Sequence, residues 1–190
     1  IVFIPATGWQ DYNYIKYARV AGEDSNAVVS FHYYLPMLLS HYKMLAWVGY
    51  QGAVQYPGVV IPTQSDADKY PQYASFHKTT YNADRIMGEM SNAASDGRNA
   101  GLAVHCGEFG CSKNVAEAMR LAWFTDMVAA MEANNIPWTL WECLDGGFGF
   151  VDMEYGIYRI NCPLLKVLTG KELTDAEAKA LLQKYGFKTE

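Results

Sequence analysis

The sequence predicts an α/β fold made of four parallel β/α units. Short apolar, strand-like runs alternate with helical patterns four times along the chain, which is typical of parallel sheets. The runs are apolar at nearly every residue, as in strands that are buried on both faces. Polar side chains follow the ends of these runs, where β/α barrels build their active sites. A complete barrel takes eight strands and about 250 residues, so we expect half of a (β/α)8 barrel, one segment over residues 1–190.

The composition is that of an ordinary globular chain. Its 190 residues are 51% apolar, 14% aromatic and 18% charged, which excludes a disordered chain. The net charge of −5 argues against a nucleic-acid partner. No apolar run reaches the roughly 18 residues that a membrane span needs, so we expect no membrane partner. Ile1 rather than Met opens the sequence, and we expect that an upstream segment was removed or is not included.

The first two units fill the first half of the sequence. Residues 1–5 form the first apolar run, and the apolar spacing after it predicts a short helix over residues 12–21. The second strand is expected at residues 27–33, followed by a long aromatic loop over residues 34–71. Helical patterning returns over residues 80–94 and closes the second unit.

The last two units are more regular. Residues 101–106 predict the third strand, and residues 115–134 its helix. The fourth strand is expected at residues 136–141, before a glycine-rich loop at residues 145–150. A capping box over residues 174–177 predicts the start of a last helix in the tail.

The four cysteines are Cys106, Cys111, Cys143 and Cys162, and none forms a C-x-x-C pair. This spacing argues against zinc and thioredoxin-like sites, and the density is too low for a disulfide scaffold. Because Cys106 and Cys143 lie in apolar runs, we expect them to behave as small buried hydrophobes.

A carboxylate stands at the end of the third strand, within Gly107-Glu108-Phe109-Gly110. The flanking glycines permit close approach of a ligand. An unpaired buried charge is costly, so Glu108 needs a partner or a chemical role. Two interpretations stay open: a nucleophile or acid/base, or a structural carboxylate paired with a nearby basic residue.

The second strand ends in Phe31-His32-Tyr33-Tyr34. Because side chains alternate across a strand, His32 and Tyr34 share one face. Together they could position and polarise a carboxylate across the pocket. The alternative is a hydrogen-bonded core histidine.

The fourth strand ends with Trp141 and Glu142, after Trp138, which we expect in the core. An exposed Trp at a barrel mouth is a platform for a sugar ring, and the alternative for Trp141 is core packing. Glu142 is either a second active-site carboxylate or an ion-pair partner, and the spacing does not choose between them.

The long loop is rich in aromatic side chains and poor in charge. Such a surface suits an open groove for an uncharged polar polymer, and the alternative is a loop that packs on itself. Single-stranded nucleic acid also stacks on aromatics, but it needs a basic groove that this chain lacks. The residues concerned are Tyr42, Trp47, Tyr50, Tyr56, Tyr70 and Tyr73.

Together these motifs resemble glycoside hydrolase family 5, the cellulase-like retaining (β/α)8 barrels. Residues 32–34 resemble the family's His-x-Tyr on strand six, and residues 107–110 its nucleophile motif on strand seven. Residues 141–142, with the Gly-Phe-Gly-Phe-Val-Asp of residues 147–152, resemble the strand-eight signature of bacterial endoglucanase-like members. The chain therefore looks like strands five to eight of that barrel.

The resemblance implies roles for individual residues. Glu108 is implied as the nucleophile, and His32 and Tyr34 as the residues that orient it and the bound sugar. Trp141 is implied as the platform under the sugar at the cleavage point. Trp9 and Trp47 are further substrate-site candidates by the same resemblance. The family often has Gln-Gly-Ala after the Ser-His pair of residues 40–41, whereas this chain has Tyr-Lys-Met.

The largest departure from the family is an absent carboxylate. The family's acid/base is a Glu after Asn at the end of strand four, and no Asn-Glu-Pro segment exists in this sequence. A retaining mechanism needs two carboxyl groups about 5–5.5 Å apart, so Glu108 alone cannot perform both roles.

Two arrangements could supply the second carboxylate. In one, the chain is the C-terminal half of a longer enzyme and needs the missing N-terminal half barrel. In the other, two copies form a homodimer through their open strand edges, as a two-fold, isologous contact. The fourth strand of one copy would then take the place of the family's strand four, which brings Glu142 near the missing acid/base. Within one chain Glu142 neighbours Glu108 and lines the site.

The implied reaction is retaining hydrolysis of internal β-1,4 bonds in a β-glucan polysaccharide or oligosaccharide, without a metal or organic cofactor. The alternatives are a non-catalytic truncated or carbohydrate-binding half barrel, and a mannanase or xyloglucanase of the same family. The resemblance also suggests a secreted or periplasmic protein, with which the isoelectric point of about 5.4 is compatible.

Overall fold

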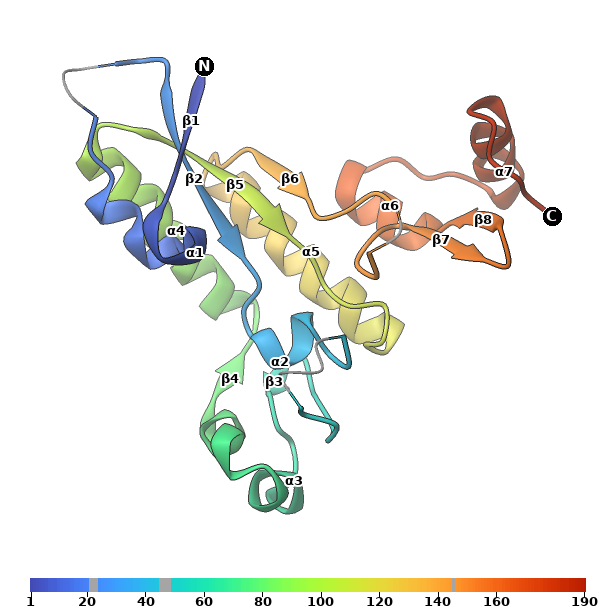
Figure 1. The fold of residues 1–190 in the computed structure, drawn as a ribbon, viewed down its shortest axis with the longest axis horizontal. Coiled ribbons are helices and arrows are strands. Elements are labelled where there is room, and N and C mark those ends of the chain that lie inside the picture. Colours follow the sequence, from blue (N-terminus) through green and yellow to red (C-terminus); the bar gives the residue numbers. More distant parts are fainter. Residues whose placement is uncertain (21–23, 45–48, 145) are drawn as a thin grey trace.

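The computed structural model describes residues 1–20, 24–44, 49–144 and 146–190 (Figure 1). A four-stranded sheet lies at its centre, and two long helices cover one face of that sheet. A lobe of short elements extends below the sheet in the view of Figure 1, and a C-terminal hairpin and helix extend to its side.

The central sheet is parallel throughout, in the order β1-β2-β5-β6. These strands are β1 (Val2–Pro5), β2 (Ala27–Tyr33), β5 (Ala103–Phe109) and β6 (Trp138–Leu140). All four were expected from apolar runs, and consecutive units lie side by side as in a β/α barrel. The predicted half barrel with four parallel strands is confirmed.

Helices α4 (Ala83–Ala100) and α5 (Glu117–Ala133) cover the outer face of the sheet. Asn82 caps α4, since its side chain accepts a hydrogen bond from the backbone of Arg85 at 3.0 Å. Helix α4 ends where Gly101 takes a left-handed conformation, with φ of 70°. The apolar face of α5 is fully buried at Trp123, Phe124 and Met127 and makes the centre of the core.

The opposite, inner face of the sheet is more open than the sequence indicates. Phe3 is 55% exposed, and Ala103 and Thr139 are exposed as well. The prediction of strands buried on both faces is therefore wrong for β1 and β6, although it holds for most of β2. The physical reason is that a half barrel leaves two edge strands and an inner face without the layer that would close around them.

The connection after β1 also differs from its prediction. A short turn, α1 (Thr7–Gln10), leads into the 3₁₀ helix η1 (Tyr12–Tyr17), which replaces the helix expected over residues 12–21. Asp11 caps η1 by accepting a hydrogen bond from the backbone of Asn13 at 2.8 Å. The tighter 3₁₀ winding is favoured in such a short segment.

The segment between β2 and α4 folds into a small lobe rather than an open groove. Tyr50 and Tyr56 are each 2% exposed, and the rings of Tyr50 and Tyr70 lie 4.8 Å apart. Of the two interpretations that the sequence left open, the structure therefore favours the loop that packs on itself. Trp47 lies outside the described residues. The elements of the lobe are α2 (Met37–Ser40), β3 (Gly58–Val59), α3 (Gln64–Lys69), η2 (Pro71–Lys78) and β4 (Thr80–Tyr81).

The tail contains a hairpin that the sequence analysis missed. Strands β7 (Val151–Glu154) and β8 (Ile157–Ile160) pair in antiparallel fashion, and helices α6 (Cys162–Thr169) and α7 (Asp175–Lys184) follow. The capping box of Thr174 at the start of α7 is present as predicted.

Two of the four free cysteines are buried, namely Cys106 and Cys111. Cys143 is exposed, so the expectation of a second buried hydrophobe there is wrong. It lies in the loop after β6, beyond the end of the sheet. In the described ranges no helix is long and apolar enough to cross a membrane.

Candidate active site

The candidate site forms where β2 and β5 end side by side. His32 lies directly across from Glu108 in the parallel register, because neighbouring parallel strands bring their carboxyl ends to the same edge. The register shifts between residues 31 and 32, which leaves Gly107 without a partner on β2. A Cβ atom at Gly107 would lie 2.5 Å from Ser30 Oγ, so this irregularity requires a glycine.

Two side chains hold Glu108: His32, on β2, and Tyr34, directly after it. The Tyr34 hydroxyl donates a hydrogen bond to Glu108 Oε2 at 3.0 Å. His32 Nδ1 lies 3.3 Å from the same oxygen. The Glu108 side chain keeps 27% of its surface exposed, so a ligand can reach the carboxylate. The structure thus brings together the three residues that the sequence placed at two strand ends.

Burial sets the protonation of both partners of Glu108. It lowers the pKa of His32, which the nearby Glu108 charge opposes, so the imidazole is neutral at neutral pH. A neutral ring donates to the carboxylate only with its proton on Nδ1. Burial, followed by the Glu108 charge, raises the pKa of Tyr34 well above its usual range. Tyr34 is therefore fixed as a hydrogen-bond donor to Glu108, and His32 is a neutral polar neighbour of the same oxygen.

Trp141 directly follows β6 and is 46% exposed. Its backbone N–H donates to the carbonyl of Phe109 at 2.9 Å, and the peptide bond between Trp141 and Glu142 is cis. This exposure fits a surface platform and not the core packing that the sequence left open. Trp138 is partly buried and packs edge-on against Phe109, with ring centroids 5.2 Å apart.

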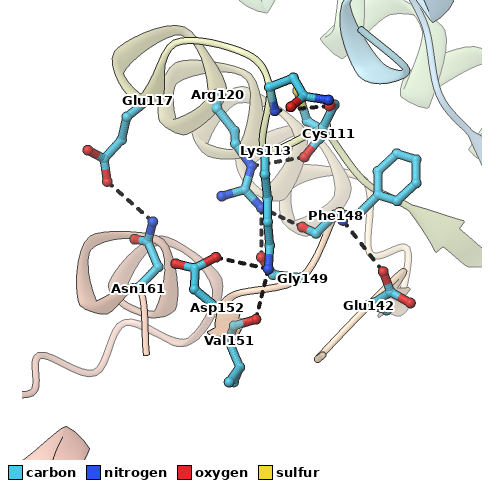
Figure 2. A network of polar contacts seen from close by, with 12 residues as sticks. Cys111, Lys113, Glu117, Arg120, Glu142, Phe148, Gly149, Val151, Asp152 and Asn161 are labelled. Atoms are coloured by element: carbon cyan, nitrogen blue, oxygen red, sulfur yellow. Dashed lines mark hydrogen bonds and ion pairs between the residues drawn. The ribbon is translucent and has the colours of Figure 1, made fainter. Parts of the chain in front are cut away.

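Glu142 lies under the glycine-rich loop that follows it. The backbone N–H of Phe148 donates to Glu142 Oε1 at 3.5 Å (Figure 2). A Cβ atom at Gly146 would lie 2.4 Å from the same carboxylate oxygen, so the loop passes closely over the carboxylate. Within the described part of the chain, Glu142 forms no ion pair, which leaves the site-lining interpretation open and disfavours the ion-pair one.

An aromatic cluster packs behind Tyr34. The His41 ring lies 4.9 Å from the ring of Tyr34 and 5.2 Å from that of Phe148, and the last two rings are 5.8 Å apart. Burial lowers the pKa of His41, so this ring is also neutral at neutral pH. Sequence reasoning assigned no role to His41 or Phe148. Two features of the sequence could have pointed to them: His41 lies within the long aromatic loop, and Phe148 is an aromatic residue in the glycine-rich loop.

A cavity of about 530 Å³ opens beside the partners of Glu108. Trp9, His32, Tyr34, Met37 and His41 contribute to its wall. Trp9 is 99% exposed and holds a left-handed backbone with φ of 62°, which is unusual for a bulky residue. The cavity thus joins Trp9 to the Glu108 cluster. Among the described residues no group of His, Cys, Asp or Glu side chains is arranged to hold a metal ion.

Comparison with known proteins places this arrangement in a family. Residues 1–147 match the family model described as cellulase, glycosyl hydrolase family 5. Endoglucanase C of Acetivibrio thermocellus is 22% identical over 143 residues, which cover 72% of this chain and 39% of that protein. The chain therefore spans about two-fifths of the length of this curated relative.

Solved structures show the same fold. An endoglucanase structure superposes with a TM-score of 0.67 at 20% identity, covering 90% of this chain and 48% of the other. A hyperthermophilic endo-β-1,4-glucanase in complex with substrate superposes with a TM-score of 0.65 at 21% identity, covering 89% and 47% of the two chains. The present chain thus matches about half of each. The fold, the ordered site motifs and the family match over 147 residues lead to one conclusion: this chain belongs to glycosyl hydrolase family 5.

Proposed function

We propose that this chain is the nucleophile-bearing half of a retaining endo-β-1,4-glucanase. The observation that carries the proposal is the Glu108 carboxylate, held by Tyr34 and His32 at the open end of β5. Family membership adds the class of reaction, glycoside hydrolysis. Secretion is part of the same proposal, because a polymeric glucan is met outside the cell.

In the proposed reaction Glu108 attacks the anomeric carbon of a bound sugar. The glycosidic bond breaks, a glycosyl-enzyme ester forms on the carboxylate, and the leaving oxygen takes a proton from an acid. Water then attacks the same carbon, loses its proton to the conjugate base, and releases the sugar with retained configuration. Tyr34 and His32 fix the rotation of the carboxylate, and Trp141 and Trp9 offer aromatic faces for the sugar rings.

The Glu108 cluster contains the proposed nucleophile but no acid/base, so a second carboxyl group must supply that role. A retaining pair stands about 5–5.5 Å apart across the sugar. In our proposal the second group comes either from an N-terminal half barrel or from Glu142 of a second copy. Either partner would close the barrel over the open inner face of the sheet.

An activated substrate tests the nucleophile without needing the acid. Dinitrophenolate is a weak base and leaves without protonation, so attack by Glu108 on a dinitrophenyl β-cellobioside requires no acid/base. We expect a burst of about one dinitrophenolate per chain, together with a cellobiosyl mass increase on the protein. Glu108→Gln should abolish both, whereas Glu142→Gln should preserve them.

The proposal fails if the unaltered chain gives neither burst nor mass increase, including after its concentration is raised. A chain that binds cello-oligosaccharides without either signal would be a carbohydrate-binding half barrel. The mannosyl analogue of the activated substrate, run in parallel, distinguishes a glucanase from a mannanase.

A further inference from the structure

Arg120 of α5 is a buried cation that the reaction above does not use. It is 4% exposed, and in the described residues it is the only buried arginine. Burial lowers its pKa, although the nearby charges of Asp152 and Glu117 oppose this effect. A buried charge is costly unless hydrogen bonds satisfy it, so its contacts reveal its role.

The guanidinium of Arg120 binds backbone carbonyls from two separate loops (Figure 2). Its Nε donates to the carbonyl of Cys111 at 2.9 Å, in the loop after β5. Its Nη2 donates to the carbonyl of Gly149 at 2.8 Å and to that of Phe148, in the glycine-rich loop after β6. One side chain therefore ties the loop after Glu108 of β5 to the loop that follows β6 and contains Glu142.

The two loops approach each other closely where Arg120 joins them. A Cβ atom at Gly110 would lie 2.2 Å from the carbonyl oxygen of Trp141 and 3.0 Å from the ring of Phe148. Such an approach leaves no room for a side chain between the loops. The planar, rigid fork of an arginine suits this bridging of fixed carbonyls.

Phe148 links the loops that Arg120 joins to the side chains around Glu108. Its ring packs against Tyr34 and His41, and Tyr34 donates to Glu108. Its backbone N–H points at Glu142. The position of this one residue thus affects the surroundings of both carboxylates.

We propose that Arg120 is a positioning residue, which holds Phe148 so that Tyr34 meets Glu108 and the loop covers Glu142. The expected effect of Arg120 on the reaction rate rests on the proposed function. Its expected effect on the packing of Phe148, Tyr34 and His41 does not.

Lys113 offers a matched control for a merely structural contribution. Its Nζ donates to the carbonyl of Val151 at 2.8 Å and pairs with Asp152 at 2.9 Å. Its side chain therefore ties the same β5–α5 loop to the start of β7, whereas its backbone N–H donates to the carbonyl of Gly147 at 2.8 Å, a bond that a side-chain substitution leaves in place. Lys113→Met loosens a loop of the same chain region while the Arg120 contacts remain.

The first experiment follows the four histidines by NMR titration in the unaltered chain and in Arg120→Met, Arg120→Lys and Lys113→Met. We expect Arg120→Met to raise the pKa of His41, and to a smaller extent that of His32, by about 0.5 or more, because burial holds both down. The pKa of His105, which burial also lowers at the other end of β5, should stay unchanged. Arg120→Lys should give an intermediate shift, and Lys113→Met none. Unchanged His41, or an equal shift at His105, would overturn the proposal.

The second experiment measures the dinitrophenolate burst in the same variants and in Phe148→Ala. We expect Arg120→Met to slow the burst by roughly 10- to 100-fold, with Phe148→Ala as slow and the double variant no slower. Lys113→Met should stay within about twofold of the unaltered chain. Additive effects of Arg120→Met and Phe148→Ala would contradict action through Phe148. If the unaltered chain gives no burst, the proposed function fails, and the histidine titration still decides the role of Arg120. If Arg120→Met does not fold, Arg120→Lys carries both measurements.

Discussion

Glu108 differs from an ordinary surface carboxylate because both of its partners are neutral. Tyr34 donates a hydrogen bond to it, and His32 Nδ1 lies 3.3 Å from the same oxygen. Tyr34 stays protonated since burial and the Glu108 charge raise its pKa, and His32 stays neutral since burial lowers its pKa. Neutral donors orient a carboxylate without the strong charge pairing of an Arg or Lys, which would hold the oxygen back from attack. This arrangement suits a nucleophile better than a structural ion pair.

Removing the hydroxyl of Tyr34 tests this interpretation. Tyr34→Phe keeps the ring against His41 and Phe148 but deletes the hydrogen bond to Glu108. A hydrogen bond to a charged group contributes about 1.5–3 kcal/mol, so we expect the dinitrophenolate burst to slow by roughly 10- to 100-fold. Tyr155→Phe, at an exposed ring in the turn between β7 and β8, should leave the rate unchanged. Equal rates in both variants would show that the hydroxyl is dispensable.

Three partly buried histidines also predict how stability depends on pH. Burial lowers the pKa of His32, His41 and His105 below the ordinary value of 6.5 that holds in the unfolded chain. The unfolded chain therefore binds more protons below that pH, and the free energy of unfolding falls as the pH drops through the window beneath 6.5. Urea unfolding at pH values of about 7.5 and 5.5 should show lower stability at the acidic value.

His41→Gln should make this pH dependence shallower, because one partly buried titrating ring is removed. Asp66 and Glu177 act in the same direction, since hydrogen bonds lower their pKa values, but only near their own acidic range. A free energy of unfolding that is equal or higher at the acidic value would contradict the burial of the histidines.

At the scale of elements, helix α4 contains two glycines in different surroundings, one packed against β5 and one facing solvent. A Cβ atom at Gly97 would lie 2.0 Å from Val104 Cγ2, whereas one at Gly88 would meet nothing within 4 Å. Gly97 is thus required by packing against the strand that carries Glu108. Gly88 is exposed and only weakens the helix.

The two glycines give opposite predictions for the same substitution. Gly97→Ala should lower the free energy of unfolding by about 1–3 kcal/mol through overpacking. Gly88→Ala should raise it by roughly 0.5–1 kcal/mol through better helix propensity. Urea unfolding of both variants measures the difference, and the same sign in both would refute the packing explanation.

Elements encoded by local sequence patterns could be predicted, and those that depend on contacts distant in sequence could not. The four parallel strands were found because local apolar runs encode them, and polar residues at their ends located Glu108, His32 and Tyr34. The hairpin of β7 and β8 is missed in the sequence analysis, because Val151 and Asp152, which begin β7, belong to the motif of residues 147–152. The inward packing of the aromatic lobe depends on contacts distant in sequence, which periodicity does not encode.

Arg120 was missed for a different reason. A single arginine in a helical pattern is usually taken as a solvated charge, and most arginines are exposed. One signal could have identified it: Arg120 stands three and four residues before Trp123 and Phe124, on the stripe that forms the buried face of α5. A charge on an apolar stripe requires buried partners, which in this fold are loop carbonyls.

At the scale of the whole molecule, the half barrel presents unpaired strand edges at β1 and β6 and an open inner face. Ile1, Val2 and Phe3 on the β1 edge are 85%, 59% and 55% exposed. Exposed apolar edge strands favour pairing with another chain. We therefore expect the purified chain to form species larger than its 21.3 kDa monomer at high concentration.

Sedimentation velocity over a wide dilution series measures this association. Phe3→Glu should shift the distribution toward monomer, because a charge on an edge strand opposes pairing. Tyr185→Glu, at an exposed aromatic on the opposite end of the chain, should leave it unchanged. If copies assemble the site, multiple-turnover activity per chain falls on dilution and with Phe3→Glu. A monomeric chain at every concentration would exclude the second-copy arrangement.

Glu108 lies on β5, and its two partners lie at the end of β2 and directly after it, which has a consequence for recombination. A crossover that exchanges one barrel half for another would move the carboxylate, Tyr34 and His32 as one inherited block. The geometry around the carboxylate would survive the exchange, and only the strand that brings the second carboxylate would change. A library of chimeric enzymes could therefore vary the opposing half and its substrate contacts while this half is kept constant.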